Sequence, residues 1–450
     1  MRNCFVALVS LLLAACSTSD NNGGNGGNAP SSCSNADQKR FVRDAMQDWY
    51  LWNNLLPNNI AVSDYDSPEA LLADLMRYSP DDGNGQPVDR FSFIGSAAAD
   101  AAFFGEGRYE GFGFSSQQLA ANDIRLTQVF ANSPADLGGL ARGQRIVEIN
   151  GRTVAAIQAA EGIDAVLGTS PLTFLMEEPG GAQFTTTIAR GIVTITPVPQ
   201  YRVITASDGS GRMVGYLELA SFIGTADAVL DTVFAEFVAN GVNDVILDLR
   251  YNGGGLVSTA NRLGDLLGGD VAENLVFSAT HFNPDRAAAY DSTNFFDRLA
   301  ASMSLSRLVV VASDRTASAS ELVTNSMVPH VAVTIVGGST FGKPVGQVGF
   351  EFCGKILRPT AFKTVNADGY GDYFDGLPVD CPAVDDLSIA VGADADPNMV
   401  VAMGFLDTGA CPVAAVPTAA VKTQAGRQIE SSRHAPERPL PPWREFAGAY

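Results

Sequence analysis

Short apolar runs alternate with helix-like segments between residues 215 and 336, and this alternation constrains the fold of the 450-residue chain more than any other feature. Strands that alternate with helices in this way usually form a sheet covered by helices. We therefore predict a multi-domain α/β protein. The expected strands cover residues 215–219, 244–249, 307–312 and 331–336, and the expected helices cover residues 226–240, 256–267 and 318–327.

Two of the predicted strand-to-helix turns, at residues 252–255 and 316–320, have sequences that suit catalysis. Active sites commonly occupy turns of this kind. In the second turn Ser318 lies in Thr-Ala-Ser-Ala-Ser-Glu, and Lys343 follows twenty-five residues later in Gly-Ser-Thr-Phe-Gly-Lys. A serine hydroxyl becomes a good nucleophile only when a base takes its proton. A lysine can be that base if burial, without a carboxylate partner, keeps it neutral.

The distribution of lysine supports this interpretation. The chain has five lysines, and none lies between Lys39 and Lys343, so arginine supplies the positive charge over that stretch. Arginine cannot lose its proton in a protein, whereas a desolvated lysine can. The residues alone also allow a simpler interpretation, in which Thr316 and Ser318 cap a helix and Lys343 is a solvated loop residue.

The histidines and cysteines suggest no other catalytic or metal site. His281 lies in a polar loop sequence, His330 follows a proline, and His434 lies in a tail rich in proline and arginine. No Cys-x-x-Cys or His-Glu-x-x-His spacing indicates a metal. We expect no cofactor.

The first turn follows the apolar run of residues 245–249 and reads Asp-Leu-Arg-Tyr-Asn-Gly-Gly-Gly over residues 248–255. Consecutive glycines allow backbone N–H groups to point at a developing negative charge. The same sequence could also be an ordinary glycine turn that starts a helix.

Together these motifs resemble those of the C-terminal processing peptidases, also called tail-specific proteases. The resemblance covers roughly residues 40–411. It implies that Ser318, the first serine of Ser-Ala-Ser-Glu, is the nucleophile and that Lys343, in Thr-Phe-Gly-Lys, is the general base. A glutamine four residues after the lysine often orients it in this family, and Gln347 stands there. The resemblance also implies an oxyanion hole made by the amides of Gly254 and Ala319.

An upstream segment resembles a PDZ domain. A Gly-Phe-Gly-Phe sequence is followed at the proper distance by Ser-Pro-Ala at residues 133–135 and Ile-Asn-Gly at residues 149–151. In PDZ domains a peptide adds a strand to a sheet edge, and amides of the glycine loop hold its terminal carboxylate. The peptide-binding residues implied by the resemblance are Gly111, Phe112, Gly113 and Phe114.

The N-terminus carries a targeting segment. Arg2 precedes an apolar run over residues 5–15, which is too short to span a bilayer. Residues 13–16, Leu-Ala-Ala-Cys, resemble a bacterial lipobox, which implies a lipid on Cys16, and Ser17 next to it implies sorting to the outer membrane. An ordinary secretory signal is the alternative. The expected location is the bacterial cell envelope, facing the periplasm or the exterior.

The formal net charge of −20 disfavours binding to nucleic acid or to anionic lipid, so membrane contact is expected through the lipid anchor only. Four cysteines remain after the signal, and in an exported protein they predict two disulfides with three possible pairings. We favour Cys353–Cys381 together with Cys33–Cys411, because the second would fasten the first ordered residues to the end of the catalytic domain.

The predicted organisation has six parts, and their bounds are as follows: signal peptide, 1–15; flexible tether, 16–32; N-terminal helical region, 33–104; PDZ domain, 105–195; Ser-Lys peptidase domain, 196–411; and disordered tail, 412–450. The expected function is that of a lipid-anchored serine endopeptidase whose PDZ domain recognises the C-terminus or an unfolded segment of a protein or peptide substrate. A catalytically silent PDZ-containing scaffold lipoprotein, or an esterase-like or carbohydrate-active hydrolase, are the alternatives.

Overall fold

The structure is a computed structural model that describes residues 30–120 and 122–412. The predicted signal peptide, Cys16 with its predicted lipid, all but the end of the predicted tether and nearly all of the predicted tail lie outside the described residues. No helix within the described part of the chain is long and apolar enough to cross a membrane.

A six-stranded sheet in the order β10-β11-β12-β15-β16-β21 forms the centre of the C-terminal part. Its first strand, β10 (Gln200–Thr205), is antiparallel to its neighbour, and the other five run parallel. The parallel strands are β11 (Met213–Glu218), β12 (Asp244–Asp248), β15 (Arg307–Ala312), β16 (Ala332–Gly337) and β21 (Cys381–Pro382). Every residue of β12 is buried, as expected for a central strand covered on both faces.

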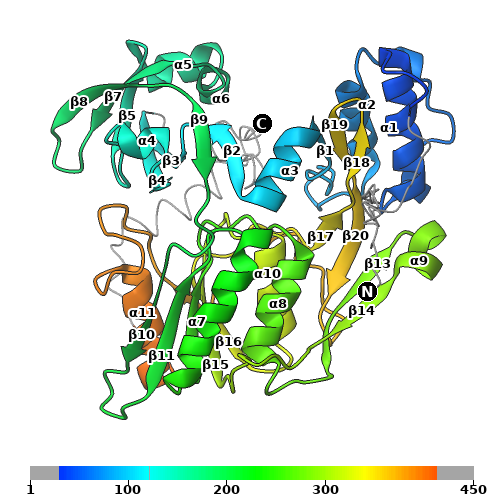
Figure 1. The fold of residues 1–450 in the computed structure, drawn as a ribbon. Helices are drawn as coiled ribbons and strands as arrows, with labels where there is room; N and C mark the ends of the chain where they lie inside the picture. Colours follow the sequence, from blue (N-terminus) through cyan, green and yellow to red (C-terminus); the bar gives the residue numbers. More distant parts are fainter. Residues whose placement is uncertain (1–29, 121, 413–450) are drawn as a thin grey trace, which may run out of the picture.

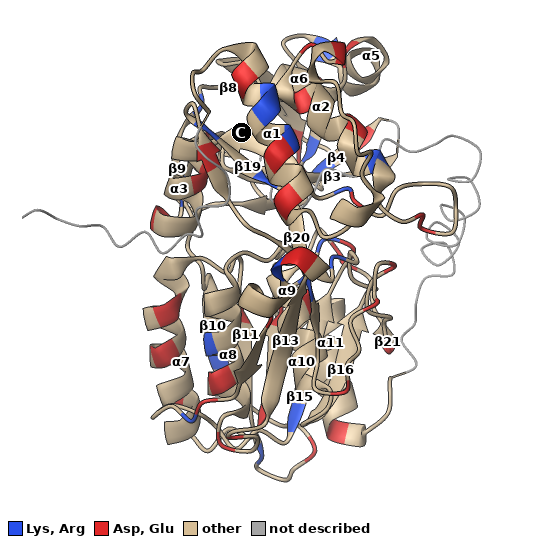
Figure 2. Ribbon diagram, turned by 90° about the vertical axis from the view of Figure 1, so that its right-hand side faces the viewer, with Lys and Arg blue, Asp and Glu red and all other residues tan. Residues whose placement is uncertain are grey.

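Helices cover both faces of this sheet, which confirms the predicted α/β core (Figure 1). One face packs against α7 (Asp227–Ala239), α8 (Val257–Gly268) and α10 (Ala319–Met327), and the other packs against α11 (Pro397–Thr408). Acidic residues recur along the outer side of α7 (Figure 2), in keeping with the negative charge of the chain.

A second sheet carries the segment that follows Lys343. Its strands, in spatial order, are β14 (Ser292–Phe295), β13 (Val276–Phe282), β20 (Thr360–Val365) and β17 (Val345–Gln347), and α9 (Pro284–Tyr290) joins β13 to β14. Because β17 begins two residues after Lys343, the sheet fixes the lysine loop at its outer edge.

The PDZ-like part has its own core of buried residues between positions 112 and 188. Its main sheet runs β3 (Phe114–Ala120), β4 (Asp123–Val129), β5 (Arg145–Ile149), β7 (Leu172–Glu177) and β8 (Gln183–Ile188), with β6 (Arg152–Thr153) paired to β5. The helices are α4 (Pro134–Leu137), α5 (Val154–Ala160) and α6 (Ile163–Leu167), and a ribbon of β2 (Arg108–Gly111) and β9 (Gly191–Thr194) leads in and out. The strand β3 is an edge strand of the main sheet.

The N-terminal helices α1 (Asn35–Trp49) and α2 (Pro68–Leu75) do not form a core alone. They share one with β18 (Phe350–Phe352) and β19 (Lys355–Arg358), a hairpin some three hundred residues later in the chain. The strand β1 (Phe93–Ser96) pairs with β19, and α3 (Ala97–Glu106) then leads into the PDZ-like part. Early and late segments of the chain therefore pack together at this hairpin, which follows the lysine loop and β17.

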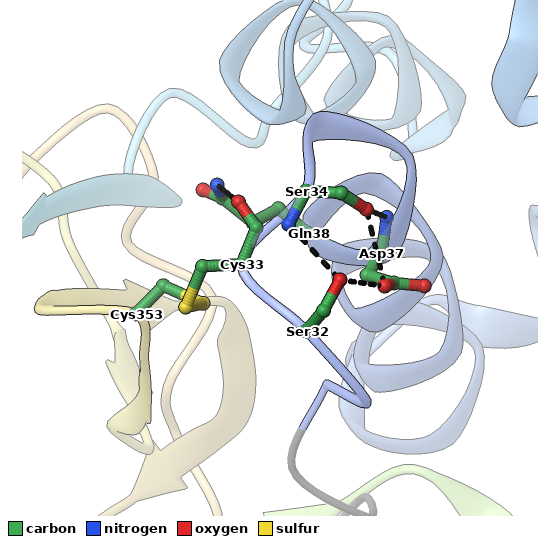
Figure 3. Close-up of a disulfide and its surroundings, with 6 residues drawn as sticks. All are labelled: Ser32, Cys33, Ser34, Asp37, Gln38 and Cys353. Carbon is green, nitrogen blue, oxygen red and sulfur yellow. Dashed lines mark hydrogen bonds between the residues drawn. A yellow bond between two sulfur atoms is a disulfide. The ribbon is translucent and has the colours of Figure 1, made fainter.

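Two disulfides are present, but the predicted pairing was wrong. Cys33 pairs with Cys353, and Cys381 pairs with Cys411, with Cα–Cα distances of 5.6 and 5.3 Å. Figure 3 shows Cys353, from the β18–β19 turn, meeting Cys33 just before α1. The physical reason is the shared core, which places the hairpin against the N-terminal helices, while α11 returns along the sheet and ends beside β21.

Candidate active site

Ser318 occupies the turn between β15 and α10 in an unusual backbone conformation. Its φ is +58° and its ψ is −115°, a region that non-glycine residues rarely adopt. An ordinary helix N-cap has an extended backbone, so capping alone does not explain this conformation. Backbone strain of this kind concentrates at functional sites, where the surrounding structure maintains it.

The glycine turn at residues 252–255 packs directly against Ser318. A Cβ added to Gly254, whose φ is +99°, would lie 2.7 Å from both the Ala317 carbonyl oxygen and the Ser318 Cβ. Only glycine therefore permits this approach. Asn252 fastens the two turns, because its carbonyl accepts hydrogen bonds from the Ala317 N–H at 3.1 Å and the Ser320 hydroxyl at 2.9 Å.

The two amides predicted for an oxyanion hole lie close together. A Cβ on Gly254 would lie 2.8 Å from the Ala319 backbone nitrogen. The Gly254 N–H, however, donates to Asn252 Oδ1 at 2.8 Å. Stabilisation of an oxyanion by this amide would require that bond to be shared or released.

Lys343 is buried, with 4% of its surface exposed, and its Nζ donates to Gln347 Oε1 at 3.0 Å. Burial lowers the pKa of the lysine to about 7, with a further lowering from the Arg358 guanidinium, although the carboxylates of Asp89 and Glu321 oppose both effects. A substantial fraction of Lys343 is therefore neutral near pH 7, as a general base requires.

Gln347 is held in the orientation that presents its oxygen to the lysine. Its Nε2 donates to the carbonyl oxygens of Phe91 at 2.7 Å and Arg358 at 3.1 Å. With both donors directed at backbone oxygens, the amide oxygen is left facing Lys343. The structure thus brings Gln347 and Lys343 together.

Glu321 is the residue that sequence reasoning missed. Its fully buried carboxylate accepts hydrogen bonds from the backbone N–H groups of Ser318, Gly342 and Lys343, at 2.9, 2.7 and 2.8 Å, and from the Thr340 hydroxyl at 2.5 Å. Burial raises the pKa of Glu321, while these four bonds oppose the rise. The carboxylate therefore clamps the serine turn to the lysine loop. Its position in Ser-Ala-Ser-Glu was the available signal, but it was interpreted only as part of a helix start.

Ser318, Lys343 and Gln347 line one cavity of about 160 Å³, together with Gly254. The rest of its wall is largely apolar, and its aromatic members are Phe93, Phe103, Phe104 and Phe362. A largely apolar cavity that contains a hydroxyl and a buried amine can support attack on a carbonyl carbon.

Comparison with known proteins identifies the family. The sequence model described as peptidase family S41 matches residues 213–380, the S41 N-terminal domain matches residues 37–93, and the PDZ domain matches residues 103–176. The chain belongs to peptidase family S41, a family of serine-type proteases. This confirms the predicted relationship to the C-terminal processing peptidases.

Relatives of this S41 chain include carboxyl-terminal-processing peptidase 3 of Arabidopsis thaliana, 28% identical over 53% of this chain and 46% of the relative. The carboxy-terminal processing protease CtpA of Bacillus subtilis is 24% identical over 58% of this chain and 53% of that protein. The chain spans about half the length of the curated relatives it matches.

Solved structures show the same fold. A crystal structure of a candidate S41 protease from Bacteroides fragilis is 23% identical, with a TM-score of 0.65 over 81% of this chain and 96% of that one. The photosystem II D1 C-terminal processing protease gives a TM-score of 0.51 at 21% identity, over 82% and 100% of the two chains.

In the PDZ domain of this S41 peptidase, the predicted peptide-binding segment contributes to the core as well as to the loop. The side chains of Phe112 and Phe114 are fully buried among the PDZ core residues, so only backbone groups of the segment can face a peptide. Gly113 has a φ of +89° and packs against Ser133, whose Oγ donates to the Gly113 carbonyl at 3.2 Å. Phe114 begins the edge strand β3, where a peptide could add.

Arginines join the PDZ domain to the peptidase part of the S41 chain. Arg142 donates to the Tyr251 hydroxyl and to Asp385, both at 2.5 Å. Arg315, three residues before Ser318, donates to the carbonyl of Ser116 on β3 at 2.6 Å. The contacts of Tyr251 and Arg315 connect PDZ residues to the residues directly before the two turns that form the candidate active site.

Proposed function

We propose that this S41 chain is an endopeptidase of the cell envelope that uses Ser318 as nucleophile and Lys343 as general base. The observation that supports this most strongly is a buried lysine, with its pKa lowered to about 7, in the same cavity as a serine on a strained turn. Structural lysines are usually charged, and a buried lysine whose pKa is lowered, in a cavity that also holds a serine, is the pattern expected of a general base.

In the proposed reaction, the Ser318 Oγ attacks the peptide carbonyl carbon while its proton passes to the neutral Nζ of Lys343. The negative charge that develops on the carbonyl oxygen is stabilised by backbone amides, for which Ala319 and Gly254 are the candidates. Collapse of the tetrahedral intermediate breaks the C–N bond, and Lys343 returns its proton to the departing amine. Water, activated by the same lysine, then hydrolyses the acyl-enzyme.

The PDZ domain is proposed to deliver the substrate. A protein C-terminus or an unfolded segment would pair with the edge strand β3, and its carboxylate would bind the amides of the Gly111–Phe114 loop. The hydrogen bond from Arg315 to the carbonyl of Ser116 on β3 supports this proposal, because Arg315 lies three residues before Ser318.

Comparison of full-length wild type with Ser318→Ala tests the proposed activity. Turnover of a fluorescein-labelled unfolded protein by the wild type, and its loss in the folded variant, would support an endopeptidase. Equal turnover by both would exclude Ser318 as nucleophile. Binding of the same protein by wild type without cleavage would favour a silent scaffold, and cleavage of esters alone would favour an esterase-like hydrolase.

Attachment to the outer membrane through a lipid on Cys16 is a separate proposal, supported by the Leu-Ala-Ala-Cys sequence at residues 13–16. Cells fed a fatty-acid analogue should label the wild type but not Cys16→Ala. A mature N-terminus at another residue would contradict the anchor without affecting the proposed chemistry.

A further inference from the structure

A second basic side chain lines the candidate active-site cavity. Of the described residues that form its wall, only Lys343 and Arg358 are basic, and none is acidic. Arg358 is the last residue of β19, and its Nε and Nη2 each donate to one carboxylate oxygen of Asp100 on α3, both at 2.6 Å. Its guanidinium carbon also lies 5.2 Å from the centre of the Phe104 ring.

Arg358 is linked to the lysine by two separate routes. Its backbone carbonyl accepts a hydrogen bond from Gln347 Nε2 at 3.1 Å, and the oxygen of that amide accepts from Lys343 Nζ. Its guanidinium places a permanent positive charge on the wall of the same cavity. A positive charge close to a buried amine disfavours the ammonium form of that amine, because both charges are poorly screened by water.

We propose that Arg358, held in place by Asp100, is a positioning residue that keeps Lys343 in its neutral, proton-accepting form. The inference deepens the proposed function and rests on it. Neither the scarcity of lysine nor the Thr-Phe-Gly-Lys motif indicates this arginine. Arg358 lies on β19, outside the lysine loop, and its partner Asp100 lies on α3.

Two carboxylates close to Lys343 oppose its neutral form. Asp89, before β1, and Glu321, on α10, are both buried carboxylates, and each favours the charged form of the lysine. Both also accept several hydrogen bonds from the protein. Arg90 bonds the carbonyls of Phe341 and Gly342 in the lysine loop. Arg358 adds to the effect of burial on the Lys343 pKa, against the two carboxylates.

Removal of the charge at Arg358 and removal of its partner should therefore have opposite effects. Arg358→Gln takes away a positive charge, which should raise the pKa of Lys343 by about one unit. Asp100→Asn leaves the guanidinium without its balancing carboxylate, which should lower the same pKa. Arg358→Lys keeps the charge and should leave the pKa close to the wild-type value. The backbone bond to Gln347 persists in all three variants.

The experiment is a pH titration of the full chain labelled with [ε-13C]lysine, followed by 13C NMR. Only five lysine signals are expected, and the signal lost in Lys343→Arg identifies that of Lys343. Arg145→Gln is the matched control, because Arg145 makes an equivalent two-bond pair with Glu177 at 3.0 and 2.8 Å in the PDZ domain. This control should not move the Lys343 signal.

Opposite shifts in Arg358→Gln and Asp100→Asn, repeated in the pH profile of substrate turnover, would support the proposal. An unchanged Lys343 titration, or shifts in the same direction, would overturn it. If Arg358→Gln does not fold, Asp100→Asn alone tests the proposal, because the proposal requires the pKa of Lys343 to fall in that variant. The titration measures the pKa of Lys343 and does not depend on activity. Absence of proteolysis in the wild type would therefore contradict the proposed function, whereas an unchanged titration in the variants would contradict this inference.

Discussion

At the scale of single residues, the proposed chemistry depends on the protonation state of Lys343. Its Nζ contacts a neutral amide oxygen inside a largely apolar cavity, and burial there lowers its pKa to about 7. Lys355 differs, because it pairs on the surface with Glu69 at 2.5 Å. The environment, rather than the residue type, makes Lys343 a candidate base.

The activity of the wild type should accordingly rise with pH. The neutral amine is the active form, so kcat/KM should be low at pH 5, increase through an apparent pKa of about 7, and level off above it. Lys343→Arg, which cannot deprotonate in this range, should fold but lose at least ~100-fold in kcat/KM at every pH. Lys355→Arg is the control and should follow the wild-type profile. A wild-type profile that is flat from pH 5 to 9 would contradict this assignment.

Sequence motifs predicted the positions of Ser318, Lys343 and Gln347, because their spacing along the chain resembles that of a known family. Arg358 and Asp100 could not be predicted in the same way. They meet because β19 pairs with β1, and α3, which carries Asp100, directly follows β1. The pairing of β1 with β19 joins segments far apart in the sequence, and no local sequence pattern predicts it. The role of Glu321 was missed because its bonds reach the lysine loop, which no helix-capping pattern describes.

At the scale of secondary-structure elements, the site is assembled where α10, the glycine turn before α8 and the loop before β17 meet. Glu321 holds the first and third of these together from inside the protein. Alternation of strands and helices predicted the central sheet and its helices well, because fully buried parallel strands such as β12 leave a clear apolar run. The hairpin β18–β19 was not predicted, because it packs against the N-terminal region, far away in the sequence. The Cys33–Cys353 pairing was missed for the same reason.

Replacement of the clamp should weaken this assembly. In Glu321→Gln one acceptor oxygen becomes an NH2 group that faces hydrogen-bond donors, so the free energy of unfolding should fall by about 1–3 kcal/mol. Turnover should fall by more than the folded fraction does, because the strained turn of Ser318 loses its support. Urea unfolding and kcat on the same sample check both effects. Unchanged stability would show that the four observed bonds contribute little.

At the scale of the whole molecule, the candidate active site lies where three regions converge. The N-terminal region supplies β1 and α3 to the cavity wall. Arg142 and Arg315 connect the PDZ domain to the segments just before the two candidate active-site turns, and the peptidase sheet carries the serine. Disulfides tie the N-terminal region to the β18–β19 hairpin and α11 to the central sheet. A peptide bound at the proposed PDZ surface would therefore be connected to the site by direct contacts.

A change in the PDZ loop should separate delivery from chemistry. In Gly113→Val the new Cβ would meet the Ser133 Cβ at 2.1 Å, at a backbone φ of +89° that valine disfavours, so the loop must shift. Cleavage of long unfolded substrates should fall at least ~10-fold, while labelling of Ser318 by a small serine-reactive probe should change much less.

Gly180→Val is the matched control in the same domain, because a Cβ there meets nothing within 4 Å. It should retain cleavage of long substrates. Thermal melting must show that both variants remain folded. Equal loss of probe labelling and turnover in folded Gly113→Val would indicate that the PDZ domain controls assembly of the site instead of delivery.

The central claim, that Ser318 is acylated with Lys343 as its base, can be tested most directly by trapping the acyl-enzyme. Full-length protein is mixed with an activated peptide ester, quenched in acid, digested and examined by mass spectrometry. The account predicts an acyl group on the peptide containing Ser318 in the wild type, with formation at least ~100-fold slower in Lys343→Arg. An adduct on another residue, such as the neighbouring cavity residue Ser221, or equal acylation in Lys343→Arg, would contradict it.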